Sequence, residues 1–218
     1  MKIVAAKKIL KANDQLAEER RNALREQGVL CINLVGSPGC GKTTLMESLF
    51  MSLGSAVAHA VIEGDIAGQV DAERIEKFKV PVVQINTDGM CHLDANMVAA
   101  ASEGIETDTV NMLWIENVGN LVCTAGYDLG EHVRLVALST PEGDDKIIKY
   151  PPIFQRSDAL IVTKTDLLPH VDFDVDKARG DMQRLAPASR MFEISATTGQ
   201  GVPALAEWLL EKMNELKR

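Results

Sequence analysis

The residues best suited to chemistry form a glycine-rich loop in the first quarter of the chain. Gly36, Gly41, Lys42 and Thr43 fit the spacing G-x-x-x-x-G-K-[ST] directly after an apolar run, the context in which this motif binds phosphates. In such a loop the backbone N–H groups point at the anion, Lys42 reaches the β- and γ-phosphates, and the Thr43 hydroxyl suits Mg²⁺. The sequence therefore predicts a nucleotide site made by Gly36, Ser37, Pro38, Gly39, Cys40, Gly41, Lys42, Thr43 and Thr44.

Two later segments would select the base of this nucleotide. Thr163-Lys164-Thr165-Asp166 resembles the N/T-K-x-D element with which GTPases read guanine, with Thr163 in place of the commoner Asn. The Asp166 carboxylate can accept hydrogen bonds from the guanine N1–H and amino group, a donor pair that adenine lacks, and the Lys164 stem can cover the ring. Ser195-Ala196-Thr197 resembles the accompanying S-A-x element, whose backbone N–H meets the guanine O6. Together these segments favour GTP over ATP.

Acidic residues at two further strand ends are candidates for magnesium and for catalysis. Asp65 ends one apolar run, where a carboxylate could hold a magnesium water or the attacking water. Glu116 ends another run, and Gly119 follows it closely enough for its N–H to sense the γ-phosphate. We therefore expect Lys42, Asp65, Glu116 and Gly119 in catalysis, and Thr43, Asp65 and Glu116 around Mg²⁺. Solvated loop acids are the alternative.

Thiol and imidazole side chains form the second candidate site. Cys91 and His92 are adjacent, so they can share an ion only from an irregular loop, and Cys123 lies seven residues after Glu116. Thiolate and imidazole suit Ni²⁺ or Zn²⁺, and three ligands per chain leave a site open or shared across a twofold axis. Spacing alone also allows the three to be ordinary loop and core residues.

The remaining cysteines and histidines have simpler interpretations. We expect Cys31 to be a buried strand residue. Cys40 is expected to be a small loop residue whose backbone N–H points at the phosphate, with a redox or metal role as its alternative. His132 is a weaker possible ligand. His59 and His170 are expected to be structural or solvated. The four cysteines lack CxxC spacing, which favours free thiols or ligands over disulfides.

The elements that must position these residues alternate between apolar runs and helix-period segments. This pattern predicts an α/β fold: a doubly wound, mostly parallel seven-stranded sheet with helices on both faces. Strands are expected near 30–35, 57–62, 80–85, 110–116, 133–140, 159–163 and 190–194, and helices near 42–53, 71–78, 93–102, 174–186 and 203–216. The stretch 141–149 and Pro151-Pro152 indicate a loop. Residues 29–218 would form this domain.

An amphipathic helix is expected before the domain, over residues 1–28. Ile9, Leu16 and Ala23 recur every seven residues, and Gly28 would stop the helix. This helix would dock on the domain, with a subunit or partner contact as the alternative.

Composition excludes several classes of protein. The formal net charge of −8 disfavours nucleic acid as a partner. No apolar stretch is long enough to span a membrane, and Ile3-Val4-Ala5-Ala6 is interrupted by lysines before it could act as a signal segment. We expect a cytoplasmic protein without a membrane partner.

From about Val29 to the C-terminus the chain resembles the HypB-type nickel-incorporation GTPases of hydrogenase maturation, which are P-loop NTPases of the SIMIBI class. The resemblance implies a GTPase that forms a GTP-dependent homodimer and works with other maturation factors to deliver nickel to the hydrogenase large subunit. It implies Cys91, His92 and Cys123 as metal ligands and Lys149 as a contact to the nucleotide across the dimer. The matching segments are Glu63-Gly64-Asp65, Asp71-Ala72-Glu73-Arg74-Ile75, Cys91-His92-Leu93-Asp94-Ala95, Glu116 to Cys123, Asp128-Leu129-Gly130-Glu131 and Glu142-Gly143-Asp144-Asp145.

Two departures from that family matter. Thr124 stands where proline is common, and no CxxC site or histidine-rich tract precedes the domain, so nickel storage by such a segment is not expected. Two rival functions stay open at this point. One is a P-loop kinase acting on a small molecule, and the other is a Zn²⁺-regulated GTPase switch or scaffold.

Overall fold

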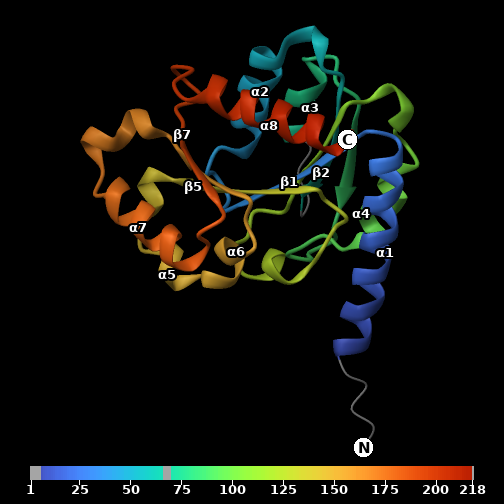
Figure 1. Cartoon of the computed structure of the whole chain (residues 1–218), viewed down its shortest axis with the longest axis horizontal. Coiled ribbons are helices and arrows are strands. Elements are labelled where there is room, and N and C mark those ends of the chain that lie inside the picture. Colours follow the sequence, from blue (N-terminus) through green and yellow to red (C-terminus); the bar gives the residue numbers. More distant parts are fainter. Residues whose placement is uncertain (1–5, 66–69, 218) are drawn as a thin grey trace, which may run out of the picture.

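The computed structural model describes residues 6–65 and 70–217. Seven strands form one sheet in the order β3-β2-β4-β1-β5-β6-β7, and every neighbouring pair is parallel (Figure 1). This confirms the predicted sheet. The strands are β1 (Leu30–Gly36), β2 (His59–Asp65), β3 (Val82–Asn86), β4 (Met112–Glu116), β5 (Val133–Ser139), β6 (Ala159–Thr163) and β7 (Arg190–Glu193).

Helices cover both faces of this sheet. Ile32 and Leu34 of β1 face a hydrophobic core that the sheet shares with α2 and α8. Cys31 and Val35 point to the other face of the sheet, where each packs in a separate core, because successive strand residues alternate between faces. The second face carries α1, α4, α6 and α7. The helices are α1 (Ala6–Glu26), α2 (Lys42–Leu53), α3 (Val70–Glu76), α4 (Ala95–Ser102), α5 (Lys146–Lys149), α6 (Pro151–Gln155), α7 (Val175–Leu185) and α8 (Val202–Leu216).

A helix forms within the expected range 1–28, as α1 over Ala6–Glu26, and residues 1–5 of that range lie outside the described residues. The residues at heptad spacing do not form its buried face. Ala23 is exposed and Leu16 is only half-buried, while the Ile9 side chain lies outside the described residues. The buried face of α1 instead carries Asn13, Ala17, Arg20 and Leu24. Two of these four are polar, so counting apolar residues at heptad spacing selected the neighbouring face.

The predicted loop over 141–149 and Pro151-Pro152 is also wrong in part, because α5 and α6 lie there. Pro151 and Pro152 occupy the first turn of α6, where a missing N–H costs nothing and a fixed φ favours the helix. Ile147, Ile153 and Phe154 are buried beneath β5 and β6. The prolines therefore start a helix here rather than interrupting the chain.

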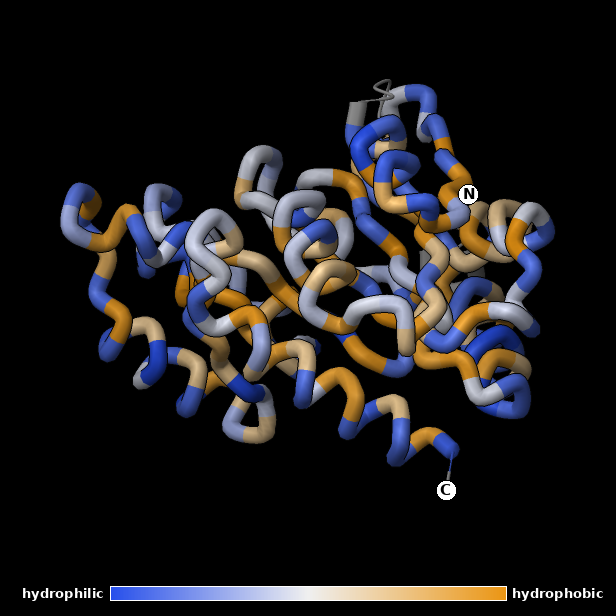
Figure 2. The backbone as a smooth tube through the Cα atoms, turned by 90° about the horizontal axis from the view of Figure 1, so that it is seen from above, coloured by the Kyte–Doolittle hydropathy of each residue, from blue (hydrophilic) through white to orange (hydrophobic). Residues whose placement is uncertain are grey.

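Hydropathy follows the layered architecture. In Figure 2 apolar residues concentrate along the inner strands, whereas helices such as α8 alternate apolar and polar residues along their length. Within residues 6–65 and 70–217, no helix combines the length and the apolar character needed to span a membrane. The carboxyl ends of β1, β2 and β4 meet at one edge of the sheet, and this edge positions the site described next.

Candidate functional site

The phosphate loop leaves β1 at Gly36 and leads into α2. A Cβ at Gly36 would lie 2.6 Å from Cys40 Sγ and 2.7 Å from the Ala137 carbonyl oxygen, so only glycine fits at this position. Cys40 is fully buried under the loop, and burial raises the pKa of its thiol to about 11. The side chain of Cys40 therefore packs against the core, and this burial leaves little support for a redox or metal role.

Lys42 and Thr43, the first residues of α2, meet Glu116 at the end of β4. The Thr43 hydroxyl donates to Glu116 Oε1 over 2.9 Å, and Lys42 Nζ lies 3.9 Å from the same oxygen. All three residues are buried, and burial raises the pKa of Glu116 to about 7, although Lys42 and the Thr43 hydrogen bond oppose the shift. Glu116 is therefore an interior acid beside the phosphate loop. Asp65 ends β2 at the same edge of the sheet and is half-buried.

Glu63 is an acid that the sequence analysis did not assign to the site. It stands opposite Glu116 in the register of β2 and β4 and is buried. Its Oε2 has no hydrogen-bond partner in the described part of the chain. Burial, followed by the charge of Glu116, raises the pKa of Glu63 to about 8. Its position two residues before Asp65 in a strand places both side chains on one face, which was the available sequence signal.

The predicted base-reading segments lie beside the phosphate loop. Thr163 Oγ1 donates to the Cys40 carbonyl over 2.6 Å, and Lys164 Nζ donates to the Gly39 carbonyl over 2.7 Å. Asp166 is exposed, whereas Ser195 is fully buried. A cavity of about 200 Å³ is lined by Gly41, Thr44, Thr163, Lys164, Asp166, Leu167, Ala196 and Thr197. Segments more than 120 residues apart thus form one pocket.

Arg74 is a second residue that sequence reasoning missed. Its guanidinium donates to Thr44 Oγ1 over 2.9 Å and pairs with Glu47 over 2.6 Å. Arg74 lies on α3, so these contacts join that helix to the start of α2. The apolar pattern that predicted α3 carries no information about this contact.

Gly119 and Asn120 connect the phosphate loop to Cys123. A Cβ at Gly119 would lie 2.9 to 3.0 Å from atoms of Pro38, so the glycine allows close packing on the phosphate loop. The Asn120 N–H donates to the Gly36 carbonyl over 3.0 Å. The Asn120 side-chain oxygen accepts from the Cys123 N–H over 2.9 Å. The phosphate loop and the candidate metal ligand thus share one residue.

The three candidate ligands lie in two loops near each other. Cys91 Sγ is 3.8 Å from His92 Nδ1, and contact with the Cys91 thiol is the largest cause of a raised pKa at Cys123. All three are half-buried. Across residues 6–65 and 70–217, no three or more His, Cys, Asp or Glu side chains are grouped so as to hold an ion. Cys91 therefore lies beside both His92 and Cys123, but the three side chains are not arranged as one group of metal ligands in the described part of the chain.

The remaining histidines and Cys31 have structural surroundings. His132 was a weak ligand candidate, and the structure contradicts it: Nδ1 accepts from the Cys31 N–H over 3.0 Å, and Nε2 donates to the Arg21 carbonyl over 3.1 Å. His59 is buried and accepts from Trp114 Nε1–H over 3.3 Å, while His170 is exposed. Cys31 is fully buried, and all four cysteines, each within the described residues, are free thiols.

Comparison with known proteins gives a consistent set of relatives. Residues 30–193 match the family described as CobW/HypB/UreG, nucleotide-binding domain. A probable hydrogenase maturation factor HypB of Methanocaldococcus jannaschii is 41% identical over 212 residues, which cover 97% of this chain and 96% of the relative. HypB of Escherichia coli strain K12 is 43% identical over 201 residues, covering 92% of this chain and 69% of the relative.

Solved structures agree with these sequences. A crystal structure of HypB from Helicobacter pylori in complex with nickel has a TM-score of 0.90 and 37% identity, and the match covers 95% of this chain and 97% of that one. HypB from Archaeoglobus fulgidus has a TM-score of 0.87 and 36% identity, with 94% of this chain and 100% of that chain covered. These structures share the fold of this chain over nearly its whole length.

Proposed function

This chain belongs to the HypB family of hydrogenase maturation factors, and from that premise we propose that it is a GTP-hydrolysing metallochaperone whose nucleotide state controls nickel binding. The single observation that carries the proposal is the contact of Asn120 with both sites. Its N–H bonds the phosphate-loop residue Gly36, and its side chain bonds the N–H of Cys123. A shift of the phosphate loop on hydrolysis would therefore move a metal ligand.

Hydrolysis of GTP is supported by the buried cluster at the sheet edge. Lys42 would neutralise the β- and γ-phosphates, and the Gly119 N–H would contact the γ-phosphate. The Thr43 hydroxyl and Glu116 carboxylate, 2.9 Å apart, offer the hard oxygen donors that Mg²⁺ prefers, with Asp65 at the same edge. Bound Mg²⁺ would supply charge neutralisation between the phosphates. Asp65 would orient the attacking water.

Recognition of guanine is supported by the 200 Å³ cavity beside the phosphate loop. Asp166 would accept from the guanine N1–H and amino group, Lys164 would cover the ring, and the backbone at Ser195 and Ala196 would meet O6. The tie from Thr163 to Cys40 fixes the base-reading segment against the phosphate loop. Because threonine has no side-chain amide, Thr163 cannot make the contact to the base that the commoner asparagine would make.

Nickel would be the cargo, held by Cys91, His92 and Cys123. A soft thiolate and imidazole donor set fits Ni²⁺ and also Zn²⁺. Half-buried ligands on two loops leave room for an open coordination position or for ligands from a second subunit. The nickel complex of the Helicobacter pylori relative supports this assignment.

GTP would favour a homodimer, in which Lys149 reaches the nucleotide of the second subunit. Lys149 is exposed on α5 beside Ile148, a large apolar side chain that is 59% exposed. The dimer would work in the cytoplasm with other maturation factors and with the hydrogenase large subunit, to which it would pass nickel. Neither nucleic acid nor a membrane takes part in this scheme.

The deciding experiment measures nickel affinity of one preparation with GDP and with a non-hydrolysable GTP analogue. Coupled sites should differ by at least about fivefold in affinity between the two states. Asn120→Ala should reduce that ratio, with Asn22→Ala on the exposed face of α1 as the matched control. Equal nickel affinity in both nucleotide states would overturn the gating.

Phosphate release without an added acceptor identifies the reaction. GTP should be hydrolysed at least about 100-fold more efficiently than ATP, and Asp166→Ala should remove most of this preference. Phosphate release that requires an added small-molecule acceptor would instead identify a kinase. Selective binding of Zn²⁺ with no nickel binding would identify the zinc-regulated switch.

A further inference from the structure

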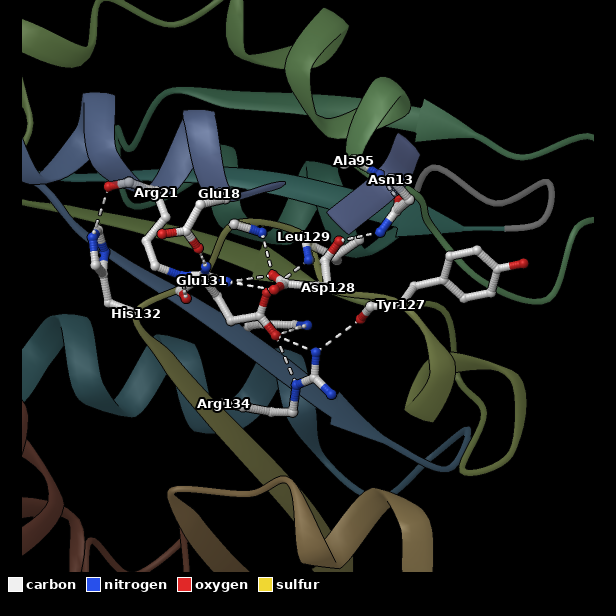
Figure 3. A network of polar contacts seen from close by, with 12 residues as sticks. Asn13, Glu18, Arg21, Ala95, Tyr127, Asp128, Leu129, Glu131, His132 and Arg134 are labelled. Carbon is white, nitrogen blue, oxygen red and sulfur yellow. Dashed lines mark hydrogen bonds and ion pairs between the residues drawn. The ribbon is translucent and has the colours of Figure 1, made fainter. Parts of the chain in front are cut away.

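Asn13 is a polar residue in the middle of α1 whose side chain is buried between two loops. Its Nδ2 donates to the Asp128 carbonyl over 2.8 Å, and its Oδ1 accepts from the Ala95 N–H over 2.8 Å (Figure 3). Asn13 is only 4% exposed. One amide group therefore joins segments that are 82 and 115 residues away from it in the sequence.

These two segments carry the candidate metal ligands. Ala95 begins α4 three residues after His92, and Asp128 lies five residues after Cys123 in the connection between β4 and β5. The planar amide of Asn13 offers a donor on one side and an acceptor on the other, so it holds both backbones at a fixed separation. The distance between the loop of Cys91 and the loop of Cys123 is thereby set from α1.

We propose that Asn13 is a positioning residue of the metal site, which fixes the separation of the two ligand loops and hence the coordination geometry. The proposal rests on the nickel-binding function proposed above. Asn13 touches no metal ligand itself and acts only through the backbones of Ala95 and Asp128.

Other residues of α1 also dock the helix on the domain. Leu24 already packs in the core shared with α4, and Arg21 pairs with Asp128 over 2.5 Å and donates to the Glu131 carbonyl over 2.9 Å. Asparagine is a weaker helix former than alanine or leucine, and burying its amide costs free energy unless every bond is made. An apolar residue at this position would leave the buried Ala95 N–H and the Asp128 carbonyl without these bonds, so the amide helps to dock the helix and fixes the two backbones at the same time.

The same connection is fixed on its other side. The Tyr127 carbonyl accepts from Arg134 Nη2 over 2.8 Å, and Arg134 is paired with Glu131. The Tyr127 ring stacks on His92, with ring centroids 4.0 Å apart and an interplanar angle of 18°. The two carbonyls on either side of Asp128 are thus held by β5 at Tyr127 and by α1 at Asp128, while the ligands nearby stay half-buried.

Small changes of this separation should matter for metal binding. Ligand distances must fall within about 0.2 Å of their ideal values, and loss of an outer partner typically lowers metal affinity by about 10- to 100-fold. Asn13→Ala removes both bonds. Asn13→Asp keeps the shape and the acceptor for Ala95 but places an oxygen against the Asp128 carbonyl.

The test uses the whole 218-residue chain and two measurements. The first requires no metal: the equilibrium between the Cys91 and Cys123 thiols and their disulfide in a glutathione buffer reports how close the thiols lie. The second is Ni²⁺ affinity, by competition with a chelator, together with the thiolate-to-nickel absorption bands. Asn22→Ala, on the exposed face of the same helix, is the control.

Both Asn13 variants should change the thiol–disulfide constant and weaken Ni²⁺ binding by about tenfold or more, with shifted absorption bands and unchanged GTP binding. GTP binding shows that the domain is folded, and the near-isosteric Asn13→Asp is tested if Asn13→Ala fails to fold. Unchanged thiol pairing and unchanged nickel spectra in either folded variant would overturn the proposal. If the parent protein binds no nickel, the proposed function fails, while the metal-free thiol measurement still decides whether Asn13 sets the spacing.

Discussion

The nucleotide region, formed by Lys42, Thr43 and Glu116, and the metal region, formed by Cys91, His92 and Cys123, differ in how far their side chains are buried. In the sequence, Cys123 lies only seven residues after Glu116. Lys42, Thr43 and Glu116 are 8%, 5% and 3% exposed and sit where β1, β4 and α2 meet in the core. Cys91, His92 and Cys123 are half-buried in loops, and α1 ties the segments that follow these loops. The first region is therefore shaped before any ligand arrives, whereas the second depends on how loops are held.

This difference suggests that the nucleotide region and the metal region have different mechanical roles. A site in the packed interior changes shape only by moving a whole segment, which suits a nucleotide whose γ-phosphate must be sensed. Loop residues held by a few hydrogen bonds rearrange at low cost, which suits an ion that must be taken up and released. If this comparison is correct, a substitution in the nucleotide region should affect mainly GTP hydrolysis, and a substitution in the metal region should affect mainly nickel affinity.

The largest effect is expected from Lys42→Ala. Loss of the charge at the phosphates should lower the rate of GTP hydrolysis by about 1,000-fold. Nickel affinity measured with GDP should stay close to that of the parent protein, because Lys42 pairs with Glu116, whereas Asn120 bonds the Gly36 carbonyl and the Cys123 N–H. A rate within tenfold of the parent, measured as phosphate release, would contradict the role of Lys42.

Cys91→Ala should have the next largest effect. Because Cys91 neighbours both His92 and Cys123 and is proposed as a direct ligand, its loss should lower Ni²⁺ affinity by at least about 100-fold, the upper end of the loss caused by removing an outer partner. GTP hydrolysis in the absence of metal should change by less than about threefold, since the buried cluster at Glu116 is intact. Chelator competition measures the first quantity, and an unchanged affinity would remove Cys91 from the site.

Acid should weaken the α1 side of the molecule through His132. Burial lowers the pKa of His132 to about 4, below its ordinary value of 6.5, so the unfolded chain binds more protons than the native state between these values. The free energy of unfolding should therefore fall as the pH drops from 6.5 to 4, by about 2 kcal/mol from this ring. Denaturant unfolding of His132→Gln should show a smaller fall than the parent, with exposed His170→Gln as the control. Equal pH dependence in all three would count against this role of His132.

The smallest effect is expected from Cys40→Ala. Cys40 is fully buried with a raised thiol pKa, so removing sulfur should change GTP hydrolysis by no more than about twofold and cost about 1 kcal/mol of stability. Alkylation of the native protein should modify Cys91 and Cys123 and spare Cys31 and Cys40. Rapid alkylation of Cys40, detected by mass spectrometry, would show that the phosphate loop opens more than its packing indicates.

Sequence reasoning succeeded where the signal is local. The helix over 42–53 and the strand over 159–163 have the predicted bounds, because each is an uninterrupted periodic segment between clear turn residues. The strand predicted near 57–62 lies at His59–Asp65, so its start was placed two residues too early and its end three. Glu63, Gly64 and Asp65 interrupt the apolar run, yet their backbones stay paired with β3 and β4.

Only part of the candidate site could be read in this way. The helices near Pro151 and the buried face of α1 were missed because proline and polar residues were interpreted by type rather than by position. His132 was considered a ligand, but contacts with Cys31 and Arg21 occupy both of its nitrogens. The two residues that contact His132 lie about 100 positions before it in the chain, so its spacing to nearby residues could not reveal them.

The amino-acid sequence by itself determined the phosphate-loop motif, the order of the seven strands along the chain, and the family, because each is encoded in short-range spacing that can be recognised without knowledge of the fold. The tertiary structure alone decided that Glu63 faces Glu116 as a buried acid and that Asn13 joins the two ligand loops. Such pairings are formed when distant segments pack, and burial then fixes the energy of each contact. Local periodicity can place Glu63 and Asp65 on one face of a strand, but it does not show which distant residue either side chain, or that of Asn13, contacts.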